Sequence, residues 1–219
     1  MSVPVLGLAR LSGLIYEDWR SVDIALAAAG LADLGRFDHA DTQAMLVQSP
    51  GWAALVFRGT EASRVRVLDL VANFGFPVAW AGCGRAHSGY LRAFNRISFS
   101  ARLMAEQGAD EIPLYATGHS MGGCLATLFA SWFYTEMPRY KLAGLVTFGA
   151  PKALDRAAAA AIACPIARYA IPLDFAQAWP PGWRLTHPAP AIALRSAQRW
   201  PGPVSRHSVD NYVASLGRA

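Results

Sequence analysis

Apolar and polar positions along the chain follow two alternating patterns. Short runs rich in apolar and β-branched residues are separated by longer segments with the character of helices. Parallel strands covered by helices on both faces produce this alternation. The sequence therefore predicts an α/β fold with a mostly parallel central sheet. The predicted strands span residues 44–48, 52–57, 113–117, 142–148, 166–171 and 192–195.

Several of the predicted helices end at a glycine or a proline, which are the residues that stop helices. Gly108 and Pro138 are two such stop signals. The sequence contains no internal repeat, Gly/Ser linker or low-complexity tail, so we expect one domain over residues 1–219. The predicted helices span residues 8–19, 91–107, 121–136, 153–163 and 208–216.

Composition indicates a folded chain with a dispersed positive charge. Apolar residues make up 53% of the sequence and charged residues 16%, which is unlike a disordered chain. The 20 Lys and Arg residues exceed the 15 Asp and Glu residues, which gives a net charge of +5. Because the basic residues form no dense block, we expect no nucleic-acid site, whereas a weak attraction to a membrane surface stays open.

Cysteine use and the first residues of the chain predict a cytoplasmic protein. The three cysteines are far apart and lack metal-ligand spacing, so neither a disulfide framework nor a zinc site is indicated. The sequence begins without the pattern of a secretory signal. Residues 112–135 carry no charged side chain, but Pro113, Gly118 and Gly122 interrupt them, so a strand, a turn and a buried helix are expected there.

The clearest chemical signal is the sequence Gly118-His119-Ser120-Met121-Gly122. It lies between a predicted strand and a predicted helix, which is the context of a nucleophile elbow. A serine hydroxyl is a weak nucleophile until such a turn exposes it beside a general base. We therefore predict that Ser120 is a nucleophile.

Four motifs in order resemble the class 3 lipase family of α/β-hydrolases, which includes fungal triacylglycerol lipases. The first three are Val56-Phe57-Arg58-Gly59-Thr60, His87-Ser88-Gly89-Tyr90 and the elbow around Ser120, and the fourth is Thr147-Phe148-Gly149-Ala150-Pro151-Lys152. The resemblance covers most of the chain and implies an α/β-hydrolase fold. It also implies that the backbone N–H groups of Thr60 and Met121 stabilise the oxyanion. The alternative interpretation of Thr60 is that it is only a turn residue or a helix cap.

The general base is expected to be a histidine after the elbow, since α/β-hydrolases order their triad as Ser, acid, His. His187 and His207 both satisfy that order. The resemblance favours His207, whose spacing to Tyr212 is similar to the ending of many class 3 lipases. Asp174 follows a predicted strand at the family's position for the acid, whereas Asp155 is expected to begin a helix.

Residues 61–86 occupy the place where fungal relatives carry a lid. Their apolar residues are predicted either to form an acyl-binding wall or cover, or to pack as core. Phe74, Phe76 and Trp80 are the candidates for contact with substrate.

Taken together, the sequence predicts a serine esterase or lipase that acts on ester or lipid substrates and needs no cofactor. A thioesterase or acyltransferase with the same triad is an alternative, because the acyl-enzyme does not dictate the second nucleophile. A catalytically silent lipid-binding module is the alternative outside enzymes.

Overall fold

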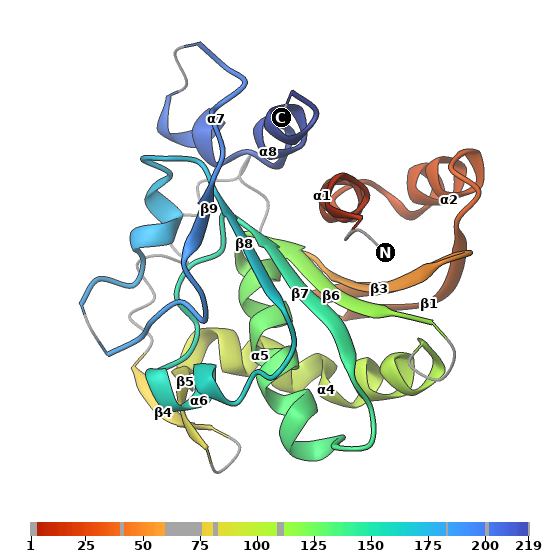
Figure 1. Ribbon diagram of the computed structural model, residues 1–219. Helices are drawn as coiled ribbons and strands as arrows, with labels where there is room; N and C mark the ends of the chain where they lie inside the picture. The colour runs from red at the N-terminus through yellow and green to blue at the C-terminus, as the bar shows by residue number, and fades with distance from the viewer. Residues whose placement is uncertain are drawn as a thin grey trace.

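The centre of the molecule is a twisted sheet (Figure 1). The computed structural model describes residues 4–39, 42–59, 76–80, 83–108, 112–182, 184–199 and 202–218. Its described strands form a seven-stranded sheet in the order β1-β2-β3-β6-β7-β8-β9. The strands are β1 (Ala32–His39), β2 (Thr42–Ser49), β3 (Trp52–Phe57), β6 (Leu114–His119), β7 (Leu142–Phe148), β8 (Ile166–Ala170) and β9 (Ala191–Ala193).

Pairing within the sheet is parallel from β3 to β9 and antiparallel among β1, β2 and β3. The prediction of a mostly parallel central sheet is thus confirmed. Parallel neighbours bring the carboxyl ends of β3, β6, β7 and β8 to one edge, and loops at that edge are where α/β folds place ligands.

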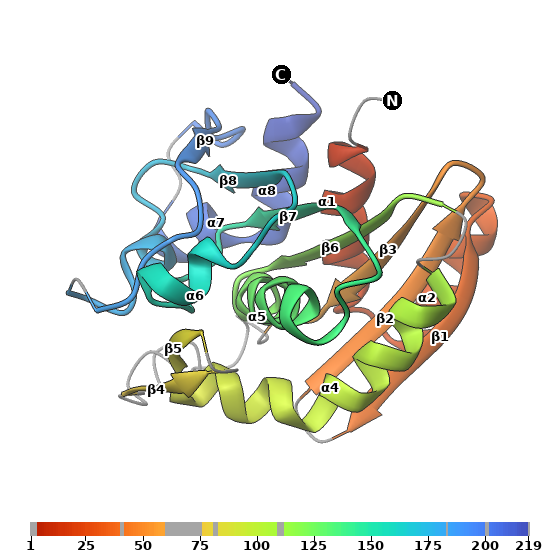
Figure 2. The same ribbon diagram turned by 60° about the horizontal axis from the view of Figure 1, so that its bottom comes forward.

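Both faces of the sheet are covered, because successive side chains of a strand point to opposite faces. Ala44 and Leu46 of β2 belong to the core on one face, and Met45 and Val47 to the core on the other. Figures 1 and 2 show α4 and α5 against the first face, with α1, α2 and α8 on the second. These helices are α1 (Val5–Leu14), α2 (Trp19–Ala28), α4 (Ser88–Gly108), α5 (Met121–Glu136) and α8 (Val209–Leu216).

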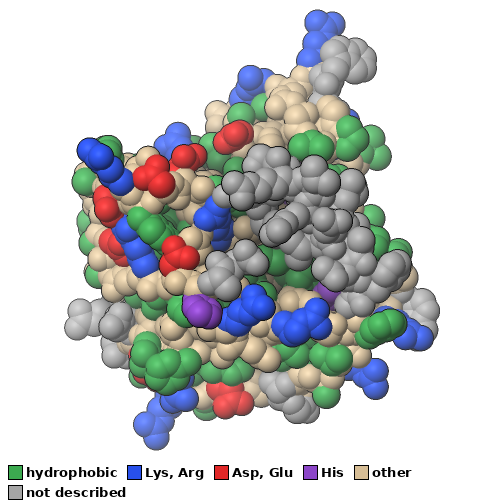
Figure 3. Space-filling view, turned by 180° about the vertical axis from the view of Figure 1, so that it is seen from behind, with side chains coloured by type: hydrophobic (Ala, Val, Ile, Leu, Met, Phe, Trp, Pro, Cys, Tyr) green, Lys and Arg blue, Asp and Glu red, His purple; other side chains and the backbone are tan. Residues whose placement is uncertain are grey.

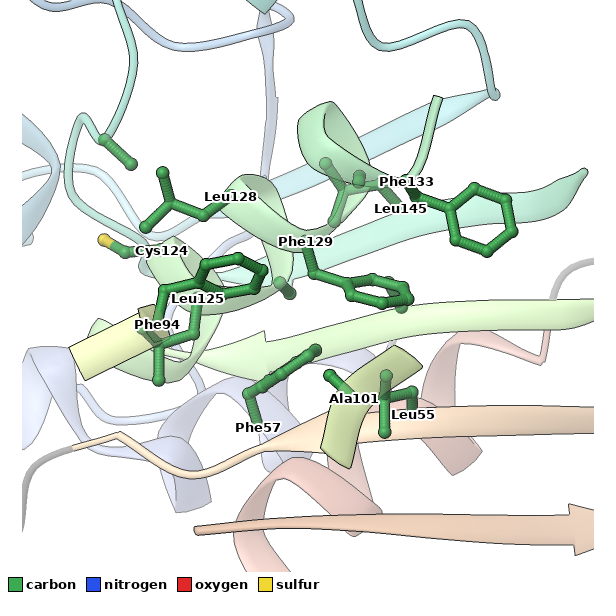
Figure 4. Packing of buried hydrophobic residues seen from close by; sticks show 14 of the residues in the cluster. Leu55, Phe57, Phe94, Ala101, Cys124, Leu125, Leu128, Phe129, Phe133 and Leu145 are labelled. Atoms are coloured by element: carbon green, nitrogen blue, oxygen red, sulfur yellow. The ribbon is translucent and has the colours of Figure 1, made fainter. Parts of the chain in front are cut away.

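Helix α5 is the most deeply buried helix, since each residue from Met121 to Ser131 is buried. Phe129 packs between Phe57 of β3 and Phe133 of its own helix (Figure 4). Burial on all sides explains why the sequence around α5 lacks charged residues. In the parts of the chain that the structure describes, no helix is both long and apolar enough to cross a membrane.

Smaller elements surround the carboxyl ends of the strands. A hairpin of β4 (Pro77–Trp80) and β5 (Gly84–His87) leads directly into α4. The backbone N–H of His87 donates to Ala153 O at 2.9 Å, which ties the hairpin to the loop after β7. The remaining elements are α6 (Arg156–Ala160), the 3-10 turn η1 (Phe175–Ala178) and α7 (Pro203–His207).

Several predicted boundaries differ from the structure, and several elements were not predicted. The helix expected at residues 8–19 is Val5–Leu14, and Asp18 caps a separate helix α2 by accepting from the N–H of Ser21. The helix expected at 153–163 is only Arg156–Ala160, because Asp155 is its N-cap. The strand expected at 192–195 is Ala191–Ala193. Strand β1, the β4–β5 hairpin, helices α2 and α7 and the turn η1 were not predicted.

Candidate active site

Ser120 lies on the sharp turn between β6 and α5 and has a φ of 56°. A positive φ is costly for a residue with a side chain, so close packing must hold the turn in place. A Cβ at Gly122 would overlap Phe57 O at the end of β3, and one at Gly118 would overlap the backbone of Gly122. The two glycines therefore let the end of β3 and the start of α5 approach the turn closely.

His207 lies beside this serine, at the end of the short helix α7. Its Nε2 atom is 2.8 Å from Ser120 Oγ, and its Nδ1 atom is 2.9 Å from both carboxylate oxygens of Asp174. A neutral imidazole with its proton on Nδ1 donates to Asp174 and accepts from the serine hydroxyl. The arrangement is that of a nucleophile, a base and an orienting acid.

Asp174 is buried, and its oxygens are held from several sides. Besides His207, it accepts from the N–H of Ala176 at 3.0 Å and from the hydroxyl of Tyr212 at 2.6 Å. Burial raises the pKa of Asp174, but the hydrogen bonds and the charge of His207, with the donors Tyr212 and Ala176, outweigh it and leave that pKa below its usual value. The carboxylate is therefore ionised at neutral pH.

Gly149 makes room for this carboxylate. The residue has a φ of 58°, and a Cβ there would lie 2.8 Å from Asp174 Oδ2 and 3.0 Å from the Tyr212 hydroxyl. The Phe148-Gly149-Ala150 motif at the end of β7 thus has a steric role beside the acid.

Tyr212 and its neighbours form a supporting network that was not predicted. The Tyr212 hydroxyl accepts from the N–H of Ile171 at 3.1 Å and from Gln177 Nε2 at 3.4 Å, so its own proton is directed to Asp174. The Gln177 amide is oriented in turn by Arg168, whose Nη1 donates to Gln177 Oε1 at 3.1 Å. In the sequence, the spacing of Tyr212 to His207 served only to favour His207 as the base, and no signal marked Gln177 or Arg168.

His119, next to the nucleophile, has a role that the sequence did not indicate. Its Nε2 atom is 2.7 Å from the carbonyl oxygen of His207, and its Nδ1 atom is 3.2 Å from the Tyr16 hydroxyl. Burial and the nearby charge of His207 lower the pKa of His119 to about 3. A neutral His119 donates to the carbonyl oxygen of His207. This hydrogen bond links the end of β6 to the last residue of α7.

His187, the alternative base, lies elsewhere. Its Nε2 atom is 2.9 Å from Gln177 O, and burial followed by the charge of Arg168 lowers its pKa to about 4. The structure thus brings Ser120 together with His207 and Asp174, and the interaction of His187 is with the backbone of η1.

The remaining predicted residues have different environments. Met121 is the first residue of α5. Phe76 is 71% exposed, whereas Trp80 is 5% exposed and donates through its indole N–H to Ser131 Oγ at 3.1 Å. Trp80 is therefore a core residue, and its contact with substrate stays a prediction. Thr60 and Phe74 lie outside the described residues. Within the described ranges, no group of three or more His, Cys, Asp or Glu residues could hold a metal ion.

Comparison with known proteins identifies the family of this chain. Residues 54–171 match the family model described as Lipase (class 3). Lipases of Rhizopus niveus and Rhizopus oryzae are each 32% identical over 105 residues, which are 45% of this chain and 26% of the relative. The match thus spans about a quarter of the length of these curated relatives.

Solved structures share the fold at low sequence identity. A Rhizomucor miehei lipase propeptide complex superposes with a TM-score of 0.72 at 19% identity, over 96% of this chain and 73% of that one. A lipase from Rhizopus microsporus var. chinensis gives 0.69 at 19% identity, over 94% and 84%. With the α/β-hydrolase fold shared and a family model that matches residues 54–171, more than half of its length, the chain belongs to the class 3 lipase family.

Proposed function

We propose that this protein is a serine carboxylic ester hydrolase that acts on lipid or acylglycerol esters. The observation that carries the proposal is the continuous set of contacts from Ser120 Oγ to His207 Nε2 at 2.8 Å and from His207 Nδ1 to Asp174 at 2.9 Å. These are the contacts that a serine nucleophile needs from its base and acid.

In the first half of the reaction, Ser120 Oγ attacks the ester carbonyl carbon while its proton moves to His207 Nε2. Asp174 stabilises the imidazolium that results. When the tetrahedral intermediate collapses, the bond to the leaving oxygen breaks and His207 returns the proton to the alcohol. The acyl group stays on Ser120.

In the second half, His207 takes a proton from water, whose oxygen attacks the acyl carbon. The new intermediate collapses, the Ser120 oxygen regains the proton, and the carboxylic acid leaves. The oxyanion of both intermediates is proposed to accept from the backbone N–H groups of Met121 and Thr60. Gly59 supports this role for Thr60, since a Cβ at Gly59 would lie 2.6 Å from His119 O, close beside the elbow.

Lipid esters are the proposed substrate class for two reasons. The chain belongs to a lipase family, and exposed apolar side chains flank the acid and the base. Leu173, next to Asp174, is 84% exposed, and Val204 of α7 is 64% exposed. Phe175 packs against His207 with ring centroids 5.2 Å apart, which adds an apolar surface beside the base.

Hydrolysis of p-nitrophenyl esters from acetate to palmitate tests the proposal. We expect turnover by the wild type, and a loss of at least about 1,000-fold in kcat for Ser120→Ala and for His207→Ala. Fluorophosphonate labelling should disappear in Ser120→Ala. Ser98→Ala and His39→Ala, which change the same residue types away from the site, should keep activity and label.

Other results would select another function. A folded wild type that neither turns over nor labels would contradict the proposal in favour of a silent lipid-binding module. Faster turnover of thioesters than of matched oxyesters would indicate a thioesterase, and transfer of the acyl group to an added alcohol in preference to water would indicate an acyltransferase.

A further inference from the structure

The outer side of α4 carries large apolar side chains in contact with solvent. Its inner side packs into the core through Ala93, Phe94, Ile97, Ala101, Met104 and Ala105. Phe99 is 73% exposed and Leu103 is 46% exposed on the opposite side. Figure 2 shows this outer side of α4 turned away from α5 and the sheet. Because Phe99 and Leu103 lie one helical turn apart, their side chains adjoin and form an apolar surface that contact with an apolar partner would bury favourably.

Arginines surround these two side chains. Arg92, Arg96, Phe99 and Leu103 follow one another at spacings of four, three and four residues, which places them on one line along the helix. Arg102 lies beside that line and is also exposed. We define the α4 face as Arg92, Arg96, Phe99, Arg102 and Leu103.

The α4 face is positively charged. The sequence of α4 contains three arginines and a single acidic residue, Glu106, which pairs with Arg102 at 3.0 Å. On the face of the molecule that Figure 3 shows, Lys and Arg side chains form no continuous patch. On α4, arginines and two large exposed apolar side chains lie on the same helix side.

We propose that the α4 face docks on the surface of an anionic phospholipid bilayer. A helix of this kind lies in the plane of the interface, with its apolar side chains among the acyl chains and its cations at the headgroups. Phe99 and Leu103 supply the apolar part, and the arginines supply the attraction to negative headgroups. The proposal concerns location and is independent of the reaction at Ser120.

Two other occupants fit this face less well. A second copy that met it symmetrically would place arginines of one protomer against those of the other, and like charges repel. A nucleic acid would satisfy the arginines but would leave Phe99 and Leu103 without an apolar partner, because binding to a phosphate backbone is electrostatic.

Co-sedimentation with vesicles tests the proposal. The protein carries Ser120→Ala, so that no lipid is hydrolysed, and the vesicles contain phosphatidylcholine alone or with phosphatidylglycerol. We expect binding to the anionic vesicles that weakens at high salt and is much lower for neutral ones. Replacing Arg92, Arg96 and Arg102 by Gln should lower the partition coefficient about 100-fold at low salt, since each basic residue near the surface contributes about fivefold.

Matched variants separate the α4 face from net charge. Arg139→Gln, Arg195→Gln and Arg199→Gln together remove the same charge from exposed positions elsewhere and should lower binding far less. Phe99→Ser with Leu103→Ser should lower binding at high salt as well, because the apolar part is not screened.

Several results would overturn the proposal. One is an equal loss of vesicle binding in the two triple Arg→Gln variants. The others are unchanged binding in the variant with Phe99→Ser and Leu103→Ser, and no binding of the protein to anionic vesicles. Self-association that depends on Phe99 and Leu103 without vesicle binding would assign the face to a second copy. Circular dichroism of each variant verifies that α4 is folded.

Discussion

At the residue scale, the hydroxyl of Tyr212 is one of the groups that orient Asp174. Tyr212 accepts two hydrogen bonds, from Ile171 and Gln177, and donates its proton to Asp174. A hydroxyl with both lone pairs in use has one direction left for its proton. The network therefore selects the donor orientation that stabilises an ionised carboxylate.

Tyr212→Phe removes that donor and leaves the buried N–H of Ile171 without its acceptor. We expect about a tenfold loss of kcat/KM and a destabilisation of about 1–3 kcal/mol, the cost of an unsatisfied buried polar group. Ester hydrolysis and urea denaturation measure the two effects. Tyr169→Phe is the control, and equal activity losses in both variants would rule out a specific role for the Tyr212 hydroxyl.

His119 provides a second prediction at this scale, because its side chain fixes the backbone of His207. His119→Ala should lower kcat about tenfold while KM changes little, since the base is displaced but substrate contacts are kept. His119→Gln, whose amide can donate to the same carbonyl, should recover part of the loss. Full activity in His119→Ala would show that the bond is dispensable.

At the element scale, the elbow depends on close contact between β3 and the start of α5. Gly122→Ala would place a methyl group against Phe57 O. We expect a destabilisation of about 2–4 kcal/mol and loss of most activity, because the end of β3 and Ser120 must move apart. Gly51→Ala, at a position where a Cβ meets nothing within 4 Å, is the matched control for thermal denaturation. A Tm for Gly122→Ala equal to that of the control would contradict the steric role.

Elements with strong local signals were predictable from the sequence. β3, β7 and α5 have the predicted boundaries, because continuous apolar runs ended by turn residues mark buried segments. β1 was not predictable in the same way, since its sequence includes Asp33, Gly35, Arg36 and Asp38 and reads as a polar loop. It is a strand because the edge of β2 offers it antiparallel partners from Ala32 to His39.

In the candidate site, too, some residues had a local sequence signal and others did not. Ser120 was marked by its turn, and Asp174 by its place after a strand. The choice between His187 and His207 needed the resemblance to a family, because both follow the elbow and only tertiary packing brings one of them within 2.8 Å of Ser120 Oγ. Gln177 and Arg168 act through contacts between segments, which no local pattern in a sequence reveals.

At the scale of the whole molecule, burial of histidines couples stability to pH. His87 and His119 are buried, and burial is the main cause that lowers their pKa values to about 4 and about 3. Burial and the charge of Arg168 lower the pKa of His187 to about 4. All three are neutral in the folded protein at a pH where the unfolded chain begins to take up protons.

The sign of the effect follows from proton counts. Between the unfolded value near 6.5 and the folded values, the unfolded state binds more protons, so the free energy of unfolding falls as pH decreases. Each histidine contributes at most about 1.4 kcal/mol per pH unit in that window. The pKa of Asp174 is also lowered, so protonation of this carboxylate decreases the free energy of unfolding further, but only at lower pH.

We therefore expect stability that is nearly constant above about pH 7 and falls steeply from about pH 6 to pH 4. Urea denaturation at intervals of half a pH unit measures this slope. His187→Gln keeps a polar side chain at its position and should flatten the slope by up to one proton. His39→Gln, at an exposed residue, is the matched control substitution. A slope near zero in the wild type would mean that the buried histidines bind protons in the folded state. It would also contradict the assignment of a neutral His119 that donates to the backbone of His207.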